Sequence, residues 1–149
     1  MNATSVAVLL VGSGARRSRK LQDHLKRRGC DISFASSCGE ALQVLRESHF
    51  DLVLSEFRLA DGTAYELMPA LRGTDATMFF SKRVEAGCWW MSAIHEGRDC
   101  CDQPGMRPAQ FTMRLDKILA YKASGKADGT GPGPAADTHA EAELQKNLP

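Results

Sequence analysis

The first feature of the sequence that could bind a ligand is the loop Gly12-Ser13-Gly14, which follows the apolar run Val6 to Val11. Glycines let backbone amides approach an anion closely, and the N-terminus of a following helix attracts negative charge. The loop therefore indicates one candidate function, a nucleotide- or phosphate-binding module. The dinucleotide pattern is incomplete, because Arg17 stands at the third glycine position and no acidic ribose ligand follows Ala35-Ser36-Ser37.

Thiolate and imidazole groups, the ligands that zinc prefers, occur late in the chain. They are Cys88, His95, Cys100 and Cys101. Their spacing lacks a paired Cys-x2-Cys arrangement, and adjacent cysteines rarely bind one metal together, so we interpret them as separate thiols. Ser13, Asp23 and His24 are more simply loop and helix surface than a catalytic set. We therefore expect no catalytic residue and no bound metal or cofactor, and we expect that the protein is not an enzyme.

Basic residues are concentrated between Arg16 and Arg28, which holds seven of the 19 lysines and arginines and a single acid, Asp23. Such a density could attract nucleic acid or an acidic partner. No aromatic residue interleaves with these charges for base stacking, and the net charge of the whole chain is only +1. We interpret the stretch as a solvated helix face and do not expect nucleic acid as a partner.

The composition is typical of one globular domain, with 149 residues, of which 43% are hydrophobic and 25% charged. No run of about 18 apolar residues is present, so no membrane span is expected. The N-terminal residues do not form a signal peptide, and five scattered cysteines are typical of reduced thiols, so the expected location is the cytoplasm. We place the domain at residues 1–121, and a tail rich in Gly, Pro and Ala at 122–149, which we expect to be disordered.

Apolar runs and amphipathic segments alternate along the first half of the chain. Strands are predicted at Val6 to Val11, Asp31 to Ala35 and Asp51 to Glu56. Helices are predicted from Ala15 to Arg28, from Ser37-Cys38-Gly39-Glu40, which has capping-box spacing, to about His49, and from Tyr65 to Gly73. This alternation predicts a three-layer α/β fold with a doubly wound parallel sheet, in which ligands bind at the carboxyl ends of the strands.

The last two strands are predicted at Thr77 to Ser81 and Cys88 to Ile94. A parallel crossover with its helix needs at least about 10 to 12 residues, and the connection from Ser81 to Gly87 is shorter. We therefore expect an antiparallel hairpin. A long loop from His95 to Arg107 then leads to a final helix that begins at Pro108.

With these elements in place, the chain resembles the receiver domains of bacterial response regulators. The residues that carry the resemblance are VAVLLV at Val6 to Val11, the segment Cys38-Gly39-Glu40-Ala41-Leu42 and, above all, Asp51 to Gly62. The resemblance is continuous to about Arg72 and looser to about Ala120. It implies a flavodoxin-like fold with strand order 2-1-3-4-5, here with the fourth helix shortened or replaced by the hairpin.

The resemblance also implies a phosphoacceptor pocket, which in this chain is degenerate. The acidic pair that holds Mg²⁺ in the family falls on Gly12 and Ser13, and the acceptor aspartate falls on Glu56. The hydroxyl position falls on Ser81, followed by Lys82. The lysine that follows the fifth strand in the family has no match, because Met91 to His95 reads MSAIH.

Two interpretations of Glu56 remain open at this stage. Its longer side chain could imitate a permanently switched-on state, although a carboxylate carries one charge and a phosphoryl group about one and a half to two; or it could be a drifted strand-end residue. Trp89 and Trp90 alternate faces of one strand, so one should enter the core, and an exposed one would be a candidate anchor for a partner. The resemblance thus suggests a pseudo-receiver of two-component signal transduction that does not accept phosphate and acts by protein-protein interaction.

Overall fold

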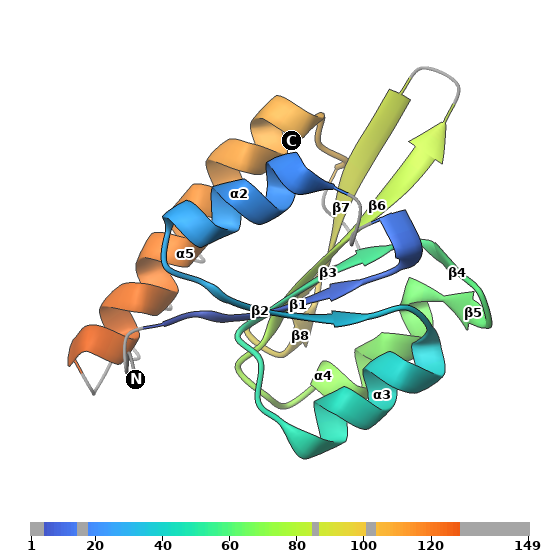
Figure 1. The fold of residues 1–149 in the computed structure, drawn as a ribbon, viewed down its shortest axis with the longest axis horizontal. Coiled ribbons are helices and arrows are strands. Elements are labelled where there is room, and N and C mark those ends of the chain that lie inside the picture. Colours follow the sequence, from blue (N-terminus) through green and yellow to red (C-terminus); the bar gives the residue numbers. More distant parts are fainter. Residues whose placement is uncertain (1–4, 15–17, 85–86, 101–103, 129–149) are drawn as a thin grey trace.

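The computed structural model describes residues 5–14, 18–84, 87–100 and 104–128. A six-stranded sheet forms the middle layer, in the order β2-β1-β3-β6-β7-β8 (Figure 1). Its strands are β1 (Ala7–Val11), β2 (Asp31–Ala35), β3 (Leu52–Glu56), β6 (Thr77–Val84), β7 (Gly87–His95) and β8 (Arg98–Asp99). The pairs among β2, β1, β3 and β6 are parallel, whereas β7 and β8 are antiparallel to their neighbours. The five long strands β1, β2, β3, β6 and β7 correspond to the predicted strands 1 to 5, and they lie in the predicted order 2-1-3-4-5.

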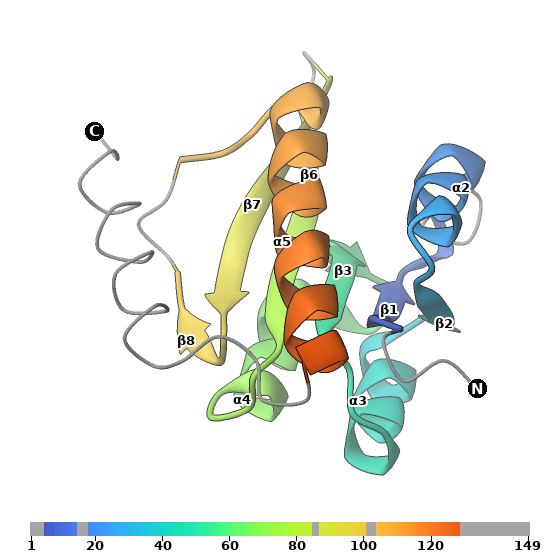
Figure 2. The same cartoon turned by 90° about the vertical axis from the view of Figure 1, so that its left-hand side faces the viewer.

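Helices cover both faces of this sheet (Figures 1 and 2). One face carries α2 (Arg19–Arg27) and α5 (Pro108–Asp128), and the other carries α3 (Cys38–Glu47), the 3-10 helix η1 (Ala64–Leu67) and α4 (Met68–Leu71). The two short strands β4 (Arg58–Leu59) and β5 (Gly62–Thr63) form a small separate ribbon beside η1. The predicted three-layer α/β arrangement is therefore observed.

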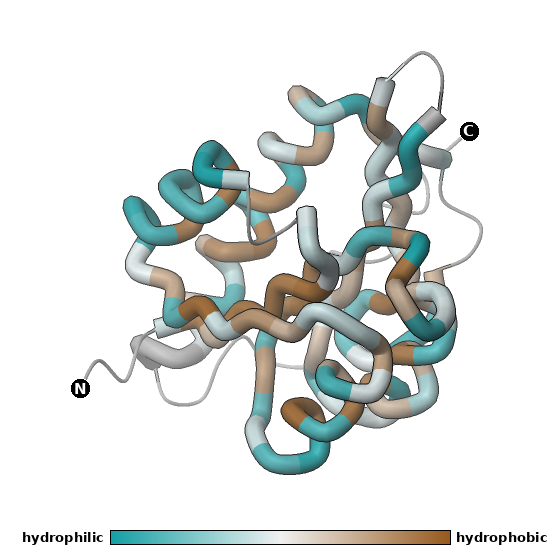
Figure 3. Tube along the Cα trace, turned by 45° about the vertical axis from the view of Figure 1, so that its right-hand side comes forward, coloured by the Kyte–Doolittle hydropathy of each residue, from teal (hydrophilic) through white to brown (hydrophobic). Residues whose placement is uncertain are grey.

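The strand β1 shows why the sequence forms a sheet that is buried on both sides. Leu9 and Val11 belong to the hydrophobic cluster under α3 and α4, whereas Val8 and Leu10 belong to the cluster under α2 and α5. All four side chains are fully buried. Successive residues of a strand point to opposite faces, so an unbroken apolar run fills both cores. The central strands are accordingly the most hydrophobic part of the chain (Figure 3).

The prediction of an antiparallel hairpin between the last long strands is confirmed. The register pairs Ser81 with Trp90 and Val84 with Gly87, and a bulge interrupts the ladder between Met78 and Phe79. The hairpin projects beyond the ends of the other strands (Figure 1). The short connection leaves no room for a crossover helix, which is the physical reason for the reversal.

The long loop predicted from His95 to Arg107 is only partly a loop. Glu96 and Gly97 both have positive φ values, 49° and 78°, and form the tight turn between β7 and β8. Two central residues of positive φ are what a two-residue hairpin turn of this hand requires. Met106 then pairs with Trp90, and the N–H group of each donates to the carbonyl oxygen of the other at 2.8 Å.

The helix predicted from Tyr65 to Gly73 is shorter and less regular than expected. It consists of η1 and α4, which ends at Leu71. Thr63 and Glu66 form a capping box at its start, in which the Thr63 N–H donates to the Glu66 carboxylate at 2.9 Å. Pro69 lies in the first turn of α4, where a missing N–H costs little.

The described helices also differ from prediction at their ends. Within the described residues α2 begins at Arg19, and Ala15 to Arg17 of the predicted helix lie outside them. Helix α5 continues to Asp128, so the predicted end of the domain at Tyr121 falls inside a helix, and Lys122 is buried. Residues 129–149 of the predicted tail lie outside the described residues. Among the described residues, no helix combines the length and the apolar character that crossing a membrane requires.

Candidate functional site

A pocket of about 530 Å³ lies at the carboxyl ends of β1, β3 and β6, where the α/β fold predicts a site. Its walls combine apolar, hydroxyl and charged side chains. The described residues that line it are Ser13, Gly14, Ser18, Leu21, Leu54, Ser55, Glu56, Phe57, Arg58, Ser81, Lys82, Arg83, Cys88 and Trp90. Four of the five predicted pocket residues, Ser13, Glu56, Ser81 and Lys82, are in this set.

The fifth, Gly12, lies directly against the side chain of Glu56. A methyl group added at Gly12 would come within 2.6 Å of the Glu56 carboxylate carbon, and one added at Gly14 would collide with a carboxylate oxygen. Gly12 also has a φ of 116°, which L side chains rarely adopt. Glu56, one methylene longer than aspartate, therefore occupies the space that side chains after β1 would need. A glycine at position 12 leaves room for the glutamate at position 56.

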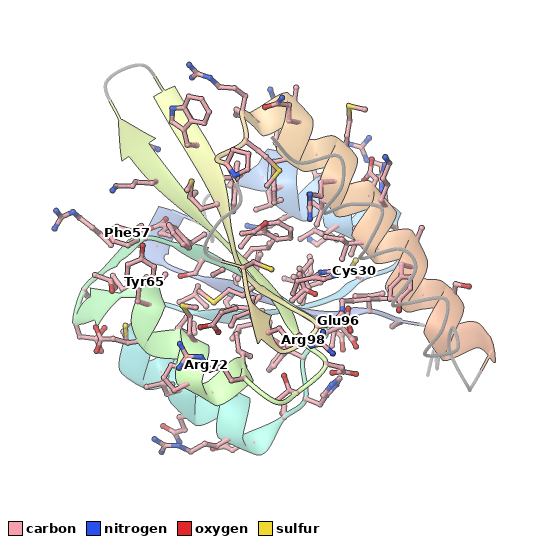
Figure 4. All side chains as sticks on the ribbon, turned by 180° about the vertical axis from the view of Figure 1, so that it is seen from behind. Cys30, Phe57, Tyr65, Arg72, Glu96 and Arg98 are labelled. Carbon is pink, nitrogen blue, oxygen red and sulfur yellow. The ribbon has the colours of Figure 1, made fainter. Side chains whose placement is uncertain are left out.

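Ser81 and Lys82 are placed by the pairing of β3 with β6. Glu56 pairs with Ser81, and the Phe57 N–H donates to the Ser81 carbonyl oxygen at 2.8 Å. Ser81 is half-buried, whereas Lys82 is exposed and its ammonium lies 5.1 Å from the centre of the Phe57 ring. Phe57 in turn contacts Tyr65 edge to face, with ring centres 5.3 Å apart (Figure 4). Ser81 is thus beside Glu56, whereas the Lys82 ammonium lies over Phe57 at the same end of the sheet.

The two tryptophans take opposite faces of β7, as predicted. Trp90 stacks on Phe111 of α5 with ring centres 4.0 Å apart, and it lines the pocket. Trp89 lies on the other face, under the guanidinium of Arg107 at 4.1 Å. Both rings are half-buried, so neither is a fully exposed anchor.

Sequence reasoning missed two cations of the pocket, Arg58 and Arg83, and two hydroxyls, Ser18 and Ser55. A signal for Arg83 was present, since it lies two residues after Ser81 on one strand and side chains two apart share a face. The signal for Arg58 was weaker, because the path of the chain after a strand end is not fixed by the strand pattern.

The loop Gly12-Ser13-Gly14 is not favoured as a phosphate cradle. The Glu56 carboxylate already lies against Gly12 and Gly14, where an anion would have to bind. A phosphate bound against these glycines would be in contact with the Glu56 carboxylate, and two negative charges so close repel each other strongly in a partly buried pocket. The zinc interpretation is also not supported, because Cys88 and His95 lie near opposite ends of β7, and Cys101 is outside the described residues.

Asp61, in the segment Asp51 to Gly62 that carries the resemblance, caps helix α3. Its carboxylate accepts hydrogen bonds from the N–H groups of Cys38 at 2.7 Å and Gly39 at 3.0 Å. Ser37 accepts a further bond from the Glu40 N–H at 3.1 Å, so one half of the predicted capping box is present. The bond from Gly39, followed by that from Cys38, lowers the pKa of Asp61.

Replacing Asp61 with alanine should therefore lower stability at neutral pH. Because the folded-state pKa lies below the unfolded value of about 3.9, the ionised carboxylate contributes stability above that value, and the contribution is lost as the pH falls through the folded-state pKa. The difference between Asp61→Ala and wild type in urea unfolding should shrink as the solution is acidified. Asp61→Asn, which keeps an acceptor without the charge, should show a smaller and less pH-dependent loss; a constant difference for Asp61→Ala would contradict the assignment.

At the opposite edge of the sheet, His49, Asp51 and Asp75 come together, with donor atoms within 4.8 Å of one another. Among the residues that the structure describes, these three form the group whose side chains could hold a metal ion. The His49 ring nitrogen lies 2.6 Å from Asp75, and Asp51 accepts a bond from the Ala7 N–H at 2.8 Å. These bonds already join the first residue of β1 to the loop before β3, and that loop to the loop before β6.

Comparison with known proteins relates this geometry to one class of fold. No protein-family model matches the chain, and no curated protein matches it. In the solved structures, the chain is similar to a response regulator receiver domain protein (CheY-like) from Methanospirillum hungatei JF-1. The similarity covers 79% of this chain and 96% of that one, with a TM-score of 0.55 and 16% sequence identity. The protein is thus an α/β protein with the fold of a receiver domain.

Proposed function

We propose that this protein is a receiver-like signalling module that does not accept phosphate and that acts by binding another protein. The observation that carries the proposal is the packing of Glu56 against Gly12. In the receiver domains that this sequence resembles, carboxylates after the first strand hold Mg²⁺ beside the phosphoacceptor aspartate. Here Gly12 and Ser13 offer no carboxylate, and Glu56 fills the space in which such side chains would stand.

The direction of β7 supports the same conclusion. Receiver chemistry uses a lysine that follows the fifth strand to bind the charge of the product. Strand β7 is antiparallel to β6, so its end at His95 lies at the sheet edge opposite to Glu56. A residue that follows β7 could not reach the pocket, and Lys82 is the described lysine that lines it. The acceptor, the metal ligands and the lysine all differ from the receiver pattern.

A module without transferable phosphate would work through recognition. The expected partner is a protein of a signalling pathway related to two-component systems, and the expected location is the cytoplasm. The proposal assigns no cofactor, and no role for a membrane or nucleic acid.

Incubation with acetyl phosphate and Mg²⁺ tests the proposal. Intact mass measurement of the full chain should show no added phosphate, under conditions that fully modify an active receiver used as a positive control. Glu56→Asp restores the usual acceptor type but not the missing metal ligands, and it should remain unmodified as well. An acid-stable, base-labile phosphate adduct on wild type would overturn the proposal.

A further inference from the structure

The mouth of the pocket carries an excess of positive charge. Three cations line it, Arg58, Lys82 and Arg83, against the single carboxylate of Glu56. All three are exposed, and none forms an ion pair with an acid among the residues described. A concave surface lined by one sign of charge attracts ligands of the opposite sign. Its ligand should therefore be acidic.

The floor of the same pocket is apolar and firmly packed. Leu54 is buried in the middle of β3, and Trp90 is held by its stack on Phe111. Phe57, beneath Lys82, also lines the pocket, but it packs with the cluster on the other face of the sheet. Apolar area that is rigid before binding contributes affinity at a low cost in conformational entropy. The ligand should thus combine acidic groups with an apolar side chain.

The edge of β6 provides a third feature, which favours a peptide over a small anion. Pairing with β3 ends at Ser81, but β6 continues to Val84. The Ser81 carbonyl faces β3, where it accepts a bond from Phe57, and the Trp90 backbone opposite it faces Met106. Backbone groups two residues apart face the same edge, so the N–H and carbonyl of Arg83 also face the β3 side, beyond the end of β3. No described strand pairs with them there.

We propose that this pocket binds an acidic segment of a partner protein in extended conformation, which pairs with the open edge of β6 at Arg83. Acidic side chains of the segment contact Arg58, Lys82 and Arg83, and an apolar side chain packs on Trp90 and Leu54. Strand addition supplies backbone hydrogen bonds, and the pocket supplies specificity through alternate side chains. This inference rests on the proposed function and assigns a site and a chemistry to its partner.

Selection of random short peptides, displayed on phage, against the immobilised full chain tests this inference. Enriched peptides should carry two or more Asp or Glu residues beside an apolar residue. Synthetic copies should bind Arg58→Glu/Arg83→Glu about tenfold or more weakly than wild type, and binding should weaken with added salt. Lys26→Glu/Lys117→Glu makes the same change in net charge at exposed positions outside the pocket and should bind like wild type.

Methylation of single amide nitrogens in the peptide tests strand pairing without altering the protein. Binding should fall when methyl groups are placed at alternate positions of the central residues and persist at the positions between them. Enriched peptides without acids, equal binding to both charge variants, no enrichment, or indifference to methylation would each overturn the inference. The proposed function would fail separately, by the appearance of a phosphate adduct.

Discussion

Replacing Gly12 with alanine should lower the free energy of unfolding by about 3 kcal/mol. Two effects add at this position. The φ of 116° is a conformation that alanine adopts only with strain, and the new methyl group would lie 2.6 Å from the Glu56 carboxylate carbon. The change is measured by urea unfolding of the full chain, followed by the fluorescence of its two tryptophans.

A double-mutant cycle with Glu56→Ala separates the two effects. Shortening Glu56 removes the steric contact but not the backbone strain, so Gly12→Ala should cost only about 1 to 2 kcal/mol in the Glu56→Ala background. Gly29→Ala is the matched control, because Gly29 also has a positive φ, 76°, but nothing lies within 4 Å of an added methyl group. It should show backbone strain alone and no coupling to Glu56. An equal cost of Gly12→Ala in both backgrounds would contradict the packing of Glu56 against the loop.

The contact between Gly12 and Glu56 is an example of what the sequence could not predict about the site. The ends of parallel strands meet at one sheet edge, so the strand pattern brought the loops after Val11 and Glu56 together, and the resemblance to receiver domains assigned Gly12, Ser13, Glu56 and Ser81 to one pocket. It could not show that Glu56 packs on Gly12, because that contact depends on the direction of one side chain after folding. The cations Arg58 and Arg83 were missed because each reads as ordinary surface until the pocket is formed.

The fold was predictable to a similar depth. Long apolar runs and the short spacing between the last two strands were enough to predict the sheet and its hairpin. Strand β8 was missed, since two residues such as Arg98 and Asp99 carry no periodic pattern. The predicted boundary between domain and tail also falls inside α5, because Lys122 is polar and follows the last aromatic residue, Tyr121. Composition cannot reveal that a lysine is buried by a distant partner.

That buried lysine gives the second large effect, at the edge of the sheet opposite to the pocket. The Lys122 ammonium donates to the Glu96 carboxylate at 2.8 Å and to the Asp75 carbonyl oxygen at 2.9 Å. Only 5% of the Lys122 side chain is exposed, against 27% for Glu96, which lies in the turn between β7 and β8 (Figure 4). The pair therefore ties α5 to the loop before β6 and to the β7-β8 turn.

Replacing Glu96 with glutamine should lower the free energy of unfolding by about 3 kcal/mol, because the buried ammonium loses its hydrogen-bonded carboxylate and keeps only the Asp75 carbonyl oxygen and the more distant charge of the Asp75 carboxylate. Lys122→Met alone should cost less, since Glu96 retains some contact with water. The double variant Glu96→Gln/Lys122→Met should lie within about 1 kcal/mol of wild type, as both charges are then removed together. Lys117→Met changes an exposed lysine of the same helix and should have almost no effect. If the double variant were as unstable as the sum of the two single variants, the two side chains would not act as a pair, and α5 beyond Tyr121 would be held by other contacts.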